Sequence, residues 1–154
     1  MNLIELRDAL AKARGPSRAL SDDVLVVAGW AKESLGSSRY GGGDVRSRGY
    51  IMVDPQGRKM LPREAPDPCG SIDAAVTLVM PLLVDGTVSY VDMNIELAAP
   101  VGAGVRLSLI FNDDRPDIEI VAPNQELAWC LARVEYEIAR SSTATPPPTD
   151  ADGA

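Results

Sequence analysis

The stretch of sequence with the most evident binding chemistry combines glycines and arginines, RYGGGDVRSR at positions 39–48. Glycine N–H groups can approach an anion closely, arginine pairs with phosphate, and a neighbouring aromatic ring can stack on a base. The segment lacks the Gly-Lys-Ser/Thr sequence of a P-loop, so a plain surface loop is the favoured interpretation. The candidate ligand-binding residues are Arg39, Tyr40, Gly42, Gly43, Arg46 and Arg48.

A second stretch of this kind is acidic and contains Asp113, Asp114, Asp117 and Glu119. Carboxylates in this density can hold Mg²⁺ or Ca²⁺. The spacing does not match a calcium-binding EF-hand loop, and Asn-Asp-Asp-x-Pro is ordinary turn chemistry. We therefore favour a solvated turn and expect neither a metal site nor a cofactor.

The sequence contains no histidine. This excludes Ser-His-Asp and Cys-His nucleophile activation, histidine general-base catalysis and every zinc site that uses histidine. Because no catalytic motif stands in its place, we expect a protein that is not an enzyme and has no catalytic residues. A metal-dependent hydrolase built on the three aspartates is the least favoured hypothesis.

The two cysteines, Cys69 and Cys130, lie far apart and neither belongs to a CxxC pair, which excludes a structural zinc site. A disulfide between them is conceivable. The sequence shows no secretory signal, however, so a reducing compartment is favoured. Cys130 lies in an apolar helical run and is expected to be a small buried hydrophobe.

The formal net charge is −7. A field of this sign repels phosphate backbones and anionic membranes, so we expect no broad nucleic-acid binding and no membrane association. DNA mimicry is disfavoured because the acidic residues are scattered. No apolar stretch reaches transmembrane length, and a cytoplasmic location is expected.

The N-terminal third predicts two helices. The first runs from Asn2 to Arg14, with a capping box formed by Asn2 and Glu5, and Gly15-Pro16 ends it. The second is expected to begin near Ser17 or Ser21 and to continue to about Lys32, although the run of valines at 24–27 could also form a strand.

The middle of the chain predicts a loop at 35–48, a hairpin of strands at 49–53 and 58–61 around the turn at 54–57, and an extended connection at 61–70. A short helix should follow from Ile72 to about Met80, capped by Ser71 and ended by Pro81. Ser17, Arg18, Ser71 and Asp73 are interpreted as capping and interhelix residues, and Trp30 and Trp129 as core residues rather than a binding platform.

The last part predicts three strands, at 87–97, 104–111 and 117–122, and a closing helix from Asn124 to about Arg140. This order predicts an α+β fold in which a small antiparallel or mixed sheet is covered by helices, as in an α/β sandwich. We expect one domain at 1–140 and a disordered tail at 141–154, which is rich in Ser, Thr and Pro.

Three segments carry a resemblance to a known family: LRDALAKARGPSRALSDDVLVVAGW at 6–30, GSIDAAVTLV at 70–79, and the segment at 123–140 that contains ELAWCLA. In order and spacing they resemble the phage ABA sandwich domain family, small phage and prophage proteins with no established function. The segments at 35–48 and 87–112 are longer than in compact members. The resemblance implies an α/β sandwich, a phage source and action inside a bacterial host, and it implies no reaction.

These observations together favour a phage or prophage accessory protein that works as a non-enzymatic binding module. Its partner is expected to be a protein, or a second copy of the chain. The alternative is a small-ligand protein that binds a nucleotide through the Gly/Arg segment at 39–48.

Overall fold

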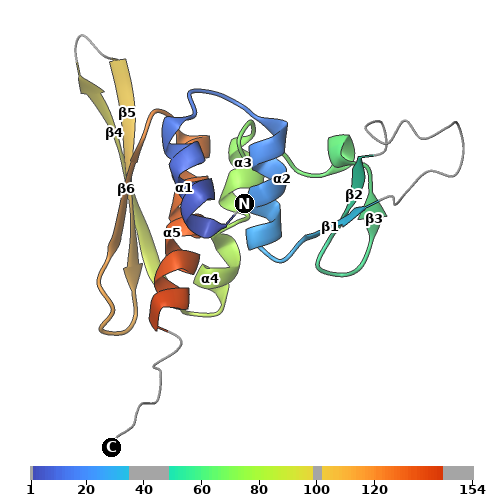
Figure 1. Ribbon diagram of the computed structural model, residues 1–154. Helices are drawn as coiled ribbons and strands as arrows, with labels where there is room; N and C mark the ends of the chain where they lie inside the picture. Colours follow the sequence, from blue (N-terminus) through green and yellow to red (C-terminus); the bar gives the residue numbers. More distant parts are fainter. Residues whose placement is uncertain (1, 35–48, 99–101, 144–154) are drawn as a thin grey trace, which may run out of the picture.

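The computed structural model describes residues 2–34, 49–98 and 102–143. They form five α-helices, one 3₁₀ helix and two three-stranded antiparallel sheets. The expectation of an α+β fold is therefore confirmed, with two sheets in place of one. In Figure 1 the helices lie between the sheets: β4, β5 and β6 stand on one side, and β1, β2 and β3 on the other.

The larger sheet consists of β4 (Val88–Ala98), β5 (Gly102–Phe111) and β6 (Ile118–Ala122), in the order β4-β5-β6. The predicted alternation in β5 is confirmed, because its inward side chains are buried: Val105, Leu107, Leu109 and Phe111. Helix α5 (Gln125–Thr143) packs on this sheet, and α1 (Leu3–Lys12) packs on α5. The main core lies between these elements.

Helix α1 begins with the predicted capping box. Asn2 Oδ1 accepts from the Glu5 N–H at 2.8 Å, and Glu5 Oε1 accepts from the Asn2 N–H at 2.9 Å. These two hydrogen bonds satisfy backbone donors that a helix start would otherwise leave unpaired.

Helix α2 (Arg18–Val27) is shorter than expected, and the continuation of the helix to Lys32 is wrong. Gly29 has a φ of +108°, and the Trp30 N–H donates to the Leu25 carbonyl at 3.0 Å, which closes the helix in a Schellman motif. The chain then turns into β1 (Ala31–Ser34). This extra strand is what makes the second sheet.

The second sheet has the order β1-β2-β3, and β2 (Tyr50–Val53) and β3 (Lys59–Met60) are the predicted hairpin. Asp54 organises the turn between them, because its Oδ1 accepts from the N–H groups of Gln56 at 2.9 Å and Arg58 at 2.8 Å. The following connection is not fully extended, since it contains the 3₁₀ helix η3 (Pro62–Glu64).

The predicted helix from Ile72 to about Met80 is in fact two short helices, α3 (Ile72–Val76) and α4 (Met80–Val84). Pro81 was expected to end a helix, but it lies in the first turn of α4, where its missing N–H has no cost. Ile72 is 41% exposed, so it lies outside the buried face of α3, to which Ala75 belongs.

Helix α5 continues to Thr143, three residues beyond the expected end, so the start of the tail at residue 141 is also wrong. The rest of the predicted tail, 144–154, and the loop at 35–48 lie outside the described residues. One hydrophobic cluster joins buried residues of both sheets and of the helices between them, including Met52, Leu107 and Leu127.

Candidate functional site

The residues that the sequence proposed as a ligand site fall where the structure gives no description. Arg39, Tyr40, Gly42, Gly43, Arg46 and Arg48 all lie within 35–48, outside the described residues. The ligand site in the Gly/Arg segment therefore stays a prediction.

The acidic turn is organised by an arginine. Arg115 donates from Nη2 to Asp113 Oδ2 at 2.8 Å and from Nε to Asp113 Oδ1 at 3.0 Å, and these hydrogen bonds hold the pKa of Asp113 below its ordinary value. Among the described residues, no group of three or more Asp, Glu, Cys or His side chains is arranged to hold a metal ion. The geometry thus favours a structural turn at this place.

The capping serines behave as expected. Ser17 Oγ accepts from the Leu20 N–H at 3.3 Å at the start of α2, and Ser71 Oγ accepts from the Ala74 N–H at 3.4 Å at the start of α3. Of the two tryptophans, Trp129 is only 8% exposed, and Trp30 packs partly buried against the same core. Neither forms an exposed platform.

A buried polar network that the sequence analysis missed joins α2 to the connection before α3. Asp22, which is fully buried, accepts from Arg18 Nη2 at 2.7 Å and from the Tyr50 hydroxyl. Arg18 also donates to the carbonyls of Ala65 at 3.2 Å and Pro66 at 2.6 Å. The i,i+4 spacing of Arg18 and Asp22 was the one signal in the sequence.

The network continues through Ser21, which is also fully buried. Ser21 Oγ donates to Asp67 Oδ1 at 2.5 Å and accepts from the Cys69 N–H at 2.9 Å. These hydrogen bonds hold the segment at 65–69 against α2, so the network has a structural role.

The two cysteines meet at the end of this network. Their Sγ atoms are 4.0 Å apart, both side chains are buried, and no disulfide joins them. The shared hydrogen bond with Cys69 and burial both raise the pKa of the Cys130 thiol. Cys130 is the small buried hydrophobe that its sequence position predicted, and its partner across the helix layer is Cys69.

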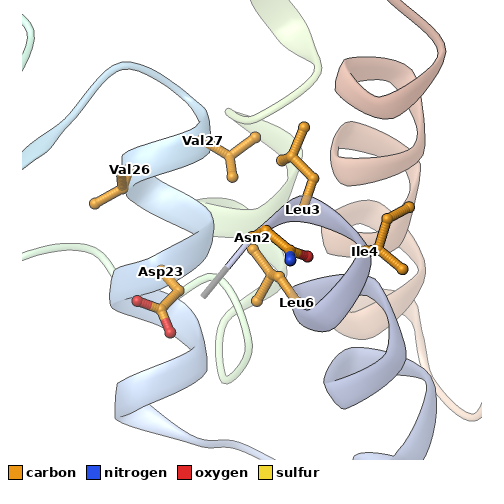
Figure 2. A pocket seen from close by; sticks show the side chains of 7 residues that line it. All are labelled: Asn2, Leu3, Ile4, Leu6, Asp23, Val26 and Val27. Carbon is orange, nitrogen blue, oxygen red and sulfur yellow. The ribbon is translucent and has the colours of Figure 1, made fainter. Parts of the chain in front are cut away.

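An apolar groove lies between α1 and α2 and has a volume of about 570 Å³. Figure 2 shows Leu3 and Leu6 of α1 on one side, with Val27 and Asp23 of α2 on the other. Leu6 is buried and forms the floor. The groove is thus apolar at its base and has a carboxylate on its wall.

Two aliphatic side chains on the outer flanks of this groove are exposed to solvent. Ile4 is 44% exposed and Val26 is 41% exposed, although both line the groove. Each lies next to the buried stripe of its helix, because Leu6 and Leu10 of α1 and Val24 and Leu25 of α2 already fill the core positions. The helices therefore present more apolar surface than their own packing uses.

A second cavity, of about 620 Å³, lies where β5 and β6 meet the end of α5. Phe111 and Tyr136 stack there with ring centroids 6.0 Å apart, and the Arg115 guanidinium lies 4.8 Å from the Phe111 centroid. Its size is typical of small-molecule pockets. Because Arg115 is bonded to Asp113 and Arg140, which also lines the cavity, pairs with Glu137 at 3.5 Å, this cavity is aromatic rather than strongly cationic.

Comparison with protein-family models, with curated proteins and with solved structures returned no match. No helix among residues 2–34, 49–98 and 102–143 is long and apolar enough to cross a membrane.

Proposed function

We propose that this chain is a non-enzymatic interaction module that binds a protein partner in the groove between α1 and α2. The observation that supports the proposal is the apolar floor of that groove, together with the exposed Ile4 and Val26 on its two outer flanks. Apolar side chains that a fold leaves clustered at its surface mark interaction sites more often than scattered ones do.

The charge around the groove supports a basic partner. Asp23 lies on its wall, Glu5 is exposed in the first turn of α1, and the chain has a net charge of −7. Lys32 bonds to Asp23 at 2.5 Å and compensates its charge, so the attraction for a basic partner comes from Glu5 and from the net charge of the whole chain. The expected partner segment presents one or two apolar anchors next to a lysine or arginine.

The proposal includes a phage or prophage origin and action in the cytoplasm of a bacterial host. This part is supported by the three resembling segments alone, 6–30, 70–79 and 123–140.

The groove can be tested by nuclear magnetic resonance on the full chain. An amphipathic peptide of leucine and lysine should shift the resonances of Leu3, Ile4, Val26 and Val27, and a leucine–glutamate peptide of the same length should not. Ile4→Asn combined with Val26→Asn should abolish the shifts. Val84→Asn changes an 80% exposed valine on α4 and should leave them intact.

Shifts that spread over other surfaces, or that persist in the double variant, would contradict the groove as the docking site. Equal responses to the two peptides would contradict the role of charge. Failure of the first test would leave the apolar side chains of α1 and α2 with only a packing function.

A second candidate function is the binding of a nucleotide-sized ligand. It is supported by the aromatic cavity beside α5 and by the Gly/Arg segment. Binding assays with adenosine and with adenosine monophosphate distinguish these two candidate sites. Adenosine without a phosphate should be enough for binding in the cavity at Phe111 and Tyr136, because that cavity is aromatic. Binding through Arg46 and Arg48 should require the phosphate and disappear in the Arg46→Ala, Arg48→Ala variant.

A further inference from the structure

The described strands offer four sheet edges, and three of them are short. Edge β1 has four residues and includes Lys32 and Glu33, and edge β3 has two residues, one of them Lys59. Edge β6 has five residues and is preceded by Pro116 and followed by Pro123. Short strands, charges and prolines are the usual means by which proteins prevent pairing with another chain.

The fourth edge, β4, is much longer, and its charged residues are Asp92 and Glu96. It has 11 residues without a lysine, arginine or proline, and its pairing with β5 is regular from Tyr90 to Ala98 after one irregularity near Val88. Tyr90 is 56% exposed and Ile95 is 59% exposed. A long edge with exposed apolar side chains is a template for a further strand.

The sequence of β4 fits a second copy of itself. Its midpoint is Met93, so full antiparallel overlap of two copies sets Met93 against Met93 and Val91 against Ile95, all on the helix-covered face. On the outer face the same register sets Asp92 against Asn94, a carboxylate against an amide. A register centred one residue earlier would set Asp92 against Asp92, which like-charge repulsion disfavours.

We propose that two chains associate through antiparallel pairing of their β4 edges, which gives a continuous six-stranded sheet with the helix layers on one face. The partner is a second copy of this chain, held by backbone hydrogen bonds and by the apolar row of Val91, Met93 and Ile95. This surface is separate from the α1–α2 groove. A result that disproves the dimer therefore leaves the proposed docking function untouched, and the reverse also holds.

The test uses substitutions at Asn94, measured on the full chain by light scattering and by sedimentation over a range of concentrations. The unchanged chain should be a dimer that dissociates on dilution. Asn94→Asp should weaken the dimer by about tenfold, because two carboxylate pairs then face each other across the two-fold axis. Asn94→Lys should strengthen it, since lysine would face Asp92 of the second copy.

The matched control is Val121→Asp, on the opposite edge of the same sheet. Asn94 and Val121 both oppose Arg106 in the registers of this sheet, so the two variants add the same charge next to the same residue. Val121→Asp should leave the dimer affinity unchanged. The inference is overturned if the chain is monomeric up to its solubility limit, or if the three variants shift the equilibrium equally.

Discussion

Asp22 is a carboxylate that the fold removes completely from water and surrounds with donors from two other residues. Asp22→Asn should lower the free energy of unfolding by about 2–4 kcal/mol, because the Arg18 guanidinium and the Tyr50 hydroxyl lose a charged acceptor. Urea unfolding measures this change directly.

The neighbouring residue supplies a matched control for that experiment. Asp23 bonds to Lys32 near the surface, with side-chain exposures of 23% and 35%. Asp23→Asn should cost less than about 1 kcal/mol, since solvent screens such a pair. Similar costs for the two variants would show that the buried network contributes no more than a surface ion pair.

Tyr50 links the same network to pH. Burial and the hydrogen bond that its hydroxyl donates to Asp22 raise the pKa of Tyr50 from 10.0 to about 12. Because the pKa is higher in the folded state, this contribution to stability is complete below about pH 10 and is lost as the pH rises toward about 12.

Tyr50→Phe should therefore be less stable than the unchanged chain at pH 9, and the difference between the two should shrink steadily above about pH 10. Unfolding by urea at a series of pH values measures both curves, and tyrosinate absorbance identifies the late-titrating hydroxyl. A difference that stays constant across the alkaline range would disprove the coupling of Tyr50 to Asp22.

At the scale of elements, the start of α5 depends on one side chain that the sequence already marked. Asn124 Oδ1 accepts from the Leu127 N–H at 2.9 Å. Asn124→Ala should lower the unfolding free energy by about 1 kcal/mol, whereas Asn124→Asp keeps an acceptor and should cost almost nothing. Thermal unfolding measures the stability of the two variants. Equal losses of stability would mean that the side chain of Asn124 does not cap the helix.

The strands and the closing helix could be predicted because they carry strong local periodicity. The three strands of the larger sheet and α5 fall within a few residues of the expected ranges. The ends of α2 and of α3 were wrong for a different reason. A glycine can lie within a helix or end it, and a proline can end a helix or lie in its first turn. For Gly29 and Pro81, tertiary packing decides between the two.

The groove could not be predicted from periodicity. The sequence predicts which residues of α1 and α2 point to the core, but the exposure of Ile4 and Val26 depends on how the two helices lie relative to α5. The buried network escaped prediction similarly, because nothing in the local sequence pairs Asp22 with Tyr50, which lies 28 positions further on.

At the scale of the whole molecule, the two sheets differ greatly in how they contribute to the core. The larger sheet and α5 supply most of its buried apolar side chains. The smaller sheet supplies few: β1 is exposed along all four residues, and Met52 is the fully buried residue of β2. Local opening needs less free energy where fewer apolar contacts are broken.

Native-state hydrogen exchange should therefore divide the molecule into two parts. Amides of β5 and α5 should exchange only through global unfolding, and amides of β1 and β2 should exchange faster through local opening.

Met52→Ala removes the main apolar contact of the smaller sheet, and a buried truncation of this kind costs about 2–5 kcal/mol. It should therefore increase exchange in β1 and β2 much more than in β5 and α5. Leu107→Ala, a buried truncation in the larger sheet, is the counterpart and should increase exchange everywhere. If Met52→Ala also increased exchange everywhere, the two sheets would unfold as one cooperative unit, and the smaller sheet could not move independently of the surfaces proposed for binding.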